Sequence, residues 1–159
     1  MDNNNKVLNK AFDLLSRRAH SAQELRNKLY KREFFKRDID IVIAECERLG
    51  FLNDELFARD YAAELAGQGK GRFKVKMQLR GKGLSDDNIE KALEKLGDCE
   101  LENAENALNR KLVSLVHEED INKRRQKAYR FLAYRGFSSA IITKLIDKTE
   151  ELQYRKSEY

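Results

Sequence analysis

The feature that most constrains this sequence is a repeat of about fifty residues, present in three copies. Each copy has two apolar residues four apart, an apolar residue five positions later, and a second apolar pair four apart. The apolar positions of the three copies are Leu25, Leu29, Phe34, Ile39 and Ile43, then Val75, Leu79, Leu84, Ile89 and Leu93, then Ala128, Leu132, Phe137, Ile142 and Ile146. Apolar residues four apart lie on one face of a helix. Each copy therefore predicts two helices joined by a tight turn.

The residues around the central apolar position fit such a turn in two of the copies. Glycine precedes it at Gly83 and Gly136, and serine follows it at Ser85 and Ser138. Glycine readily takes the left-handed conformation that ends a helix, and serine is a preferred N-cap of the next helix. The first copy has Glu33 and no serine at these places, so Asp38 is the predicted N-cap there.

A third helix is predicted before each pair, at residues 6–17, 54–66 and 100–116. Ser21 and Glu24 fit a capping box, and Asn53 or Asp54 fits the N-cap of the fourth helix. Because a three-helix unit buries little apolar surface alone, neighbouring units must stack. The prediction is an all-α fold of three tandem three-helix repeats (1–52, 53–98, and 99–159 with a C-terminal tail) that form an elongated curved array. Residues 67–71, GQGKG, are the predicted flexible joint.

The charges are spread unevenly along the chain. Residues 67–83 carry six cations and no acid, residues 84–120 carry four cations and eleven acids, and residues 121–159 carry ten cations and four acids. Such blocks suggest an acidic or polyanionic partner that meets particular faces. The alternative for each block is that the charges simply solvate the helices.

The predicted helix 72–82 carries the first cationic stripe. Arg72, Lys76 and Arg80 share one face at 100° per residue, and Lys74 and Lys82 belong to the same acid-free stretch. Val75 and Leu79 lie on one side of the stripe, with Phe73 and Met77 on the other. This helix is therefore predicted to lie wedged between two neighbours with its stripe exposed for binding, unless these cations are ordinary surface residues.

The predicted helix 121–135 carries the second stripe. Lys123, Lys127, Arg130 and Tyr134 lie opposite the apolar face, and Arg124, Arg125 and Arg135 lie beside them. An aromatic residue among cations suits phosphate contact or an acidic protein surface. Arg135 has an alternative role, because it directly precedes Gly136 and could cap helix carbonyls.

Other conspicuous residues are first interpreted as structural. The aromatic residues predicted to pack inward are Phe34, Phe51, Phe57, Tyr61, Phe73, Phe131 and Phe137. His20 and His117 have no metal-ligand spacing around them and are predicted to be solvated. GQGKG and GKG resemble phosphate loops only in composition, and no catalytic residue, metal site or cofactor site is predicted. The absence of a signal peptide or apolar span predicts a cytoplasmic protein without membrane contact.

Four segments together are distinctive. They are SAQELRNKL, LGFLNDELFARDYA, GKGRFKVKMQLRGKGLSDDNIEKAL and KAYRFLAYRGFSSAIITKLI, and in order and spacing they resemble the RecX family over roughly residues 6–148. The resemblance implies a tandem three-helix-repeat fold that lies in the groove of a RecA–DNA filament and inhibits RecA without enzymatic activity of its own. Glu33 departs from the glycine that this family often has there.

The resulting hypothesis is a monomeric, non-enzymatic regulator of recombination, DNA repair and the SOS response. Its predicted partners are the RecA filament and, as part of that filament, DNA. The predicted contacts are the two cationic stripes and the cations beside them. The alternatives are a helix-turn-helix-like module that binds nucleic acid directly, or a helical scaffold.

Overall fold

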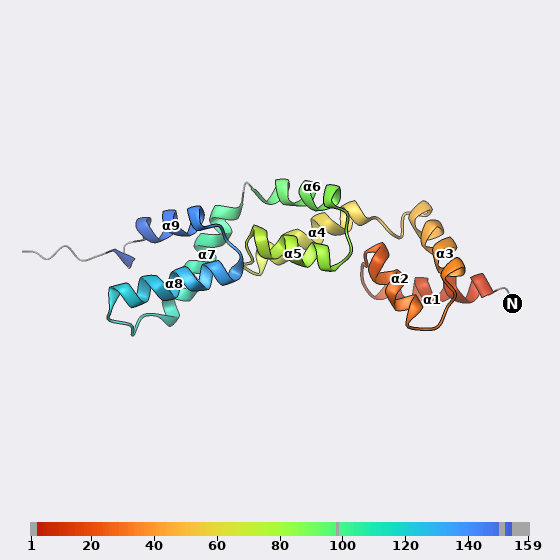
Figure 1. Ribbon diagram of the computed structural model, residues 1–159, viewed down its shortest axis with the longest axis horizontal. Helices are drawn as coiled ribbons and strands as arrows, with labels where there is room; N and C mark the ends of the chain where they lie inside the picture. Colours follow the sequence, from red (N-terminus) through yellow and green to blue (C-terminus); the bar gives the residue numbers. More distant parts are fainter. Residues whose placement is uncertain (1–2, 98, 150–151, 154–159) are drawn as a thin grey trace, which may run out of the picture. The chain divides into compact units, whose positions relative to one another are not determined.

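The computed structural model describes residues 3–97, 99–149 and 152–153, and this part of the chain forms nine helices and no strand (Figure 1). The helices are α1 (Asn3–Arg17), α2 (Ala22–Tyr30), α3 (Lys36–Arg48), α4 (Asp54–Gly67), α5 (Arg72–Gly81), α6 (Asp86–Gly97), α7 (Glu100–Ser114), α8 (Ile121–Arg135) and α9 (Ser139–Lys148). The predicted all-α fold, with three helices in each repeat, is confirmed.

The chain divides into two compact units. Unit 1 comprises the described residues up to Tyr61 together with Gln78–Ala92, and unit 2 comprises Ala62–Met77 together with the described residues from Leu93 onward. The boundaries pass through α4, α5 and α6, so the middle repeat contributes residues to both units.

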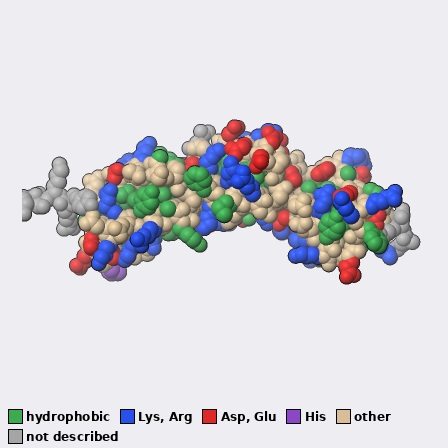
Figure 2. Space-filling model, in the orientation of Figure 1, with side chains coloured by type: hydrophobic (Ala, Val, Ile, Leu, Met, Phe, Trp, Pro, Cys, Tyr) green, Lys and Arg blue, Asp and Glu red, His purple; other side chains and the backbone are tan. Residues whose placement is uncertain are grey.

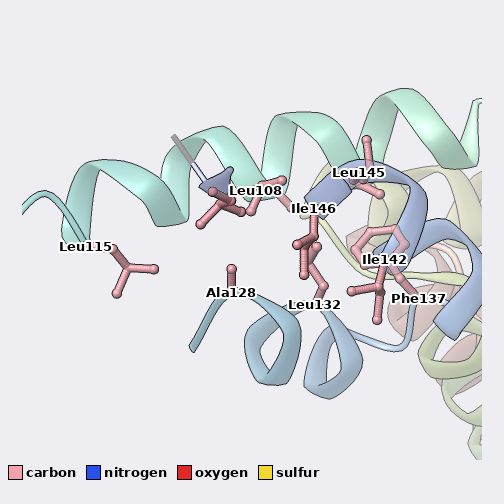
Figure 3. Close-up of a cluster of buried hydrophobic side chains, with 11 residues drawn as sticks. Leu108, Leu115, Ala128, Leu132, Phe137, Ile142, Leu145 and Ile146 are labelled. Atoms are coloured by element: carbon pink, nitrogen blue, oxygen red, sulfur yellow. The ribbon is translucent and has the colours of Figure 1, made fainter. Parts of the chain in front are cut away.

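Each unit has its own hydrophobic core, built from the repeat positions. Fourteen of the fifteen repeat positions are buried, and Phe34 is half-buried. In unit 1, α1, α2 and α3 contact one another around Leu25, Leu29 and Ile39. In unit 2, α7, α8 and α9 contact one another around a cluster that Figure 3 shows. The helical periodicity of the sequence thus places the buried faces correctly.

The turns between the second and third helices of each repeat follow the predicted geometry. Gly83 and Gly136 have φ angles of 73° and 92°, in the left-handed region. Ser85 and Ser138 accept hydrogen bonds from the backbone N–H groups of Asn88 and Ile141, each over 3.3 Å. Both predicted N-caps are confirmed.

The first repeat makes the same turn without glycine. Glu33 has a φ of 63° and is the sole non-glycine residue with a positive φ in the described part of the chain. Helix α3 begins at Lys36, and Phe35 occupies its N-cap position without a side-chain hydrogen bond. The predicted N-cap Asp38 is therefore wrong, because the N-cap position lies three residues earlier and Asp38 is in the first turn of the helix.

Replacing Glu33 by glycine is expected to stabilise the chain by about 0.5–1 kcal/mol. A side chain in the left-handed region costs about 1–2 kcal/mol, and the greater freedom of glycine in the unfolded chain offsets part of the gain. Lys31→Gly is the matched control, because Lys31 has an ordinary helical φ of −61°. Urea denaturation should show stabilisation for Glu33→Gly and destabilisation for Lys31→Gly. Equal losses in both variants would contradict strain at Glu33.

A junction in unit 1 joins the first repeat to the turn of the second. The predicted capping box of Ser21 and Glu24 is present, and the Ser21 hydroxyl also donates to the carbonyl of Lys82 over 2.6 Å. Asp54 accepts a hydrogen bond from the backbone N–H of Ala22 over 2.8 Å. The N-cap of α4 is Asn53, whose side chain accepts from Leu56 N–H over 2.9 Å. Of the two predicted caps, Asn53 is the one confirmed, while Asp54 stabilises the start of α2.

Unit 2 contains the corresponding junction between the start of α5 and the turn after α8. The N–H of Gly71 donates to the carbonyl of Arg135 over 2.8 Å, and the N–H of Phe73 donates to Gly136 over 3.1 Å. A Cβ atom added at Gly71 would lie 2.4 Å from the carbonyl carbon of Gly136. Gly69 and Gly71 are both buried. The segment 67–71 is therefore a packed connection, and its prediction as a flexible joint is wrong.

Candidate partner-binding surface

The exposed side of α5 differs from the predicted one. Val75 and Leu79 are fully buried, as predicted, but Phe73 and Met77 are 60% and 72% exposed. The prediction that α5 is wedged between neighbours on two sides is therefore wrong. Phe51 is also 57% exposed rather than buried, although its ring meets the edge of Phe12 at a centroid distance of 5.0 Å.

The cationic stripe of α5 is only partly exposed to solvent. Arg72 is half-buried, and its guanidinium donates to the carbonyl of Leu93 over 3.1 Å, while its backbone N–H donates to Glu100. Lys76 is also half-buried. Arg80 is exposed and lies 3.5 Å from a carboxylate oxygen of Asp86. Arg72 thus stabilises unit 2 by binding a helix carbonyl.

Lys74 and Tyr134, predicted from separate helices, are brought together by the structure. The Lys74 ammonium donates to the carbonyl of Tyr134 over 3.1 Å and lies 3.8 Å from the centroid of its ring. Tyr134 is nevertheless 76% exposed. We call Phe73, Lys74, Met77 and Tyr134 the α5–α8 surface. Figure 2 shows how basic and hydrophobic side chains intermingle on one face of the molecule.

The stripe on α8 is exposed along its length. Lys123, Lys127 and Arg130 are all exposed, opposite the buried Ala128 and Leu132. Lys127 forms an ion pair with Glu118 at 2.6 Å, and its hydrogen bond lowers the pKa of that carboxyl. The face is therefore exposed to solvent, and binding of a partner there stays a prediction.

The cations beside the α8 stripe have structural contacts. Arg124 donates to the carbonyl of Glu118 through Nε over 2.9 Å and also through Nη2. Arg125 donates to the carbonyl of Leu152 over 2.7 Å and to Asp147 over 2.8 Å. Arg135 donates to the carbonyl of Gln68 over 3.0 Å, in the turn that follows α4, so it binds a carbonyl of another segment rather than one at the end of its own helix.

Lys82 is held in the unit 1 junction. Its ammonium lies 2.6 Å from a carboxylate oxygen of Glu24 and 5.2 Å from the centroid of the Tyr61 ring. Burial raises the pKa of Glu24, but hydrogen bonds from Arg18 and Lys82 outweigh burial and lower this pKa to about 2. As with the other proposed contacts, binding of a partner by Lys82 stays a prediction.

His20 corrects another sequence prediction, because it is 3% exposed rather than solvated. Its Nδ1 lies 2.9 Å from the carbonyl of Arg18, and its Nε2 lies 2.7 Å from the Lys28 ammonium. A neutral ring satisfies both contacts, with Nδ1–H donating and Nε2 accepting. Burial, together with the charges of Arg18 and Lys28, lowers the pKa of His20.

The free energy of unfolding is expected to fall in two pH ranges. The pKa of His20 is lower in the folded chain than its value of about 6.5 in the unfolded chain. The contribution of neutral His20 to the free energy of unfolding is therefore complete above about pH 6.5 and is lost as the pH falls through the folded pKa. The depressed pKa of Glu24 gives a second loss between pH 4.5 and about 2. Urea denaturation at successive pH values should show that His20→Gln flattens only the first range and Glu24→Gln only the second. An unchanged profile in His20→Gln would contradict this role of His20.

Sequence reasoning missed two groups of candidate residues. Phe73 and Met77 were assigned to packing because apolar periodicity does not reveal which apolar residues stay uncovered. Arg110 and Lys111 lie in a block of the sequence with eleven acids and four cations. Because the net charge of this block is negative, its charge count did not indicate a cationic site. In the structure both help line a hollow with Arg135. The sequence does show that Arg110 and Lys111 are adjacent near the C-terminal end of the predicted helix 100–116, after most of the acids of their block.

Within 3–97, 99–149 and 152–153, there is no cluster of three or more His, Cys, Asp or Glu side chains that could hold a metal ion. None of the described helices is long and apolar enough to span a membrane.

Family models match each of the three repeats. Residues 8–46 match the first three-helix domain of RecX, residues 53–93 match the second, and residues 98–146 match the third. Together these matches span most of the chain.

Individual proteins of this family are similar to this chain over most of their length. The regulatory protein RecX of Legionella pneumophila (strain Corby) is 34% identical over 148 residues, which is 90% of this chain and 97% of the relative. The regulatory protein RecX of Haemophilus influenzae (strain PittEE) is 31% identical over 145 residues, which is 91% of this chain and 95% of the relative. The crystal structure of RecX from Lactobacillus salivarius superposes with a TM-score of 0.83 at 26% identity and covers 95% of this chain and 97% of that one. The chain belongs to the RecX family of regulatory proteins.

Proposed function

We propose that this chain binds the RecA recombinase filament and inhibits its ATP hydrolysis and strand exchange, as a non-enzymatic regulator of recombination, DNA repair and the SOS response. It acts in the cytoplasm as a monomer without a cofactor. Membership of the RecX family supports a regulatory role directed at RecA. The observation that best supports a contact with RecA is the α5–α8 surface, where Phe73, Met77 and Tyr134 are exposed beside the cation of Lys74.

Such a composition is typical of protein interfaces. Aromatic residues, methionine and arginine are enriched where partners bury surface, and a few of them supply most of the affinity. An exposed Phe, Met and Tyr together cost solubility unless a partner covers them. The exposed cations Lys123, Lys127 and Arg130 add a face that attracts an acidic protein surface or the DNA within the filament.

The test is the ATPase activity of RecA on single-stranded DNA, measured with increasing amounts of this chain. We expect inhibition at well below one molecule of this chain per RecA, because one bound molecule affects a filament of many subunits. Inhibition that appears only when the chain is abundant enough to cover the DNA would contradict the proposal, as would no inhibition.

The second candidate function is direct binding of nucleic acid, and the open cationic face of α8 favours it. It requires that the chain bind naked DNA tightly without RecA, with an affinity that falls steeply with salt. Filter binding at several salt concentrations separates the two functions, since a RecA regulator needs only weak binding to naked DNA.

A further inference from the structure

Unit 2 contains a hollow of about 230 Å³ that is not lined by any residue of the α5–α8 surface. Its walls come from the turn after α4, from α7 and from α8. The lining residues are Gln68, Gly69, Ala107, Arg110, Lys111, Ser114, Phe131 and Arg135. Three of these carry positive charge and none is acidic.

The positive groups converge on the same space. A Cβ atom added at Gly69 would lie 3.1 Å from Nη2 of Arg110 and 4.0 Å from Nη1 of Arg135. Gly69 has a φ of 77°, so glycine both permits this turn and leaves room beside the two guanidinium groups. The Lys111 ammonium lies 5.5 Å from the centroid of the Phe131 ring, and the Arg135 guanidinium lies 5.2 Å from it.

The charges in this hollow are not neutralised from within the described part of the chain. No ion pair there joins Arg110, Lys111 or Arg135 to a carboxylate. The carboxylate of Glu64 accepts a hydrogen bond from the side-chain amide of the lining residue Gln68 over 3.2 Å, and it forms no ion pair with the three cations. Like charges that converge in a partly enclosed space repel one another, and a bound anion removes that cost.

The chemistry of the groups indicates which anion fits. Guanidinium groups present several N–H donors in a fork that matches phosphate oxygens. Phe131 is half-buried and already has two cations against its ring, so it offers no open platform for stacking a base. One carboxylate would neutralise one of the three cations, whereas linked phosphates neutralise more. We propose that this hollow is a phosphate-binding pocket that takes the linked phosphates of a nucleic-acid strand or of a nucleotide.

The proposal is tested on the full chain without RecA, so its outcome is independent of the proposed function. Sodium tripolyphosphate is titrated while the amide signal of Gly69 is followed by NMR, and we expect a saturable shift. In Arg110→Gln/Lys111→Gln, affinity for tripolyphosphate should fall about tenfold or more, since hydrogen bonds between a charged donor and a phosphate oxygen are stronger than those between neutral groups. The control Lys144→Gln/Lys148→Gln removes the same charge from exposed positions of α9 and should change the affinity less than about twofold.

Two further titrations identify the source of the phosphates. Competition by an oligothymidylate without terminal phosphates supports a nucleic-acid strand as the ligand, and competition by ATP alone supports a nucleotide. Absence of a saturable shift at Gly69 would overturn the proposal. Equal loss of affinity in the pocket variant and the α9 control would also overturn it, as would competition by polyglutamate as strong as that by tripolyphosphate. Thermal melting of both variants checks that the fold is retained.

Discussion

Changing Lys123, Lys127 and Arg130 together to Glu is expected to raise the amount of this chain needed for half-inhibition of the RecA ATPase by about tenfold or more. All three side chains are exposed on one face of α8, so reversing them replaces attraction for an acidic partner by repulsion. Stability should change little. The main cost is the exposed ion pair of Lys127 with Glu118, and such pairs contribute about 0–1 kcal/mol.

The matched control reverses Lys31, Lys36 and Arg37, which are exposed in unit 1 and change the net charge by the same amount. Retention of inhibition by the control, with loss in the α8 variant, locates the contact on α8. Equal losses in both would show that net charge alone matters. Parallel measurements with naked DNA then separate the partners, because a DNA contact predicts that DNA affinity falls together with inhibition.

Gly136→Ala is expected to lower the free energy of unfolding by about 2–5 kcal/mol. Gly136 has a φ of 92°, and a Cβ atom there would lie 2.6 Å from the backbone nitrogen of Lys74. The left-handed conformation costs a side chain about 1–2 kcal/mol, and overpacking against backbone costs about 1–3 kcal/mol. Gly136 also accepts the hydrogen bond from the N–H of Phe73. The added methyl group would therefore disturb the junction between α5 and the turn that joins α8 to α9.

Gly81→Ala is the control for this change. Gly81 lies in α5, and a Cβ atom there would have nothing within 4 Å. Alanine is a better helix former than glycine by about 0.5–1 kcal/mol, so this variant should be as stable as the parent chain or more stable. Chemical denaturation of both variants gives the comparison. A loss below about 1 kcal/mol in Gly136→Ala would mean that the junction can shift apart without cost.

The sequence alone determined the helices, the repeat and the buried face of each helix. These features depend on residues close in the chain. Leu25 with Leu29 and Ile142 with Ile146 bury one helical face because they are four apart, and Ser138 caps the helix that begins next to it. At Glu33 the repeat also placed the turn, although the residue there is unfavourable for its left-handed conformation.

The tertiary structure decided which of the polar and exposed residues are free to meet a partner. Lys74 meets Tyr134 across 60 residues of sequence, and the Ser21 hydroxyl meets the Lys82 carbonyl across 61. No periodicity within one helix predicts such contacts, because they depend on how separate helices pack. For the same reason the sequence did not reveal that His20 is buried, that Arg72 binds a carbonyl, or that Arg110 and Arg135 converge beside Gly69.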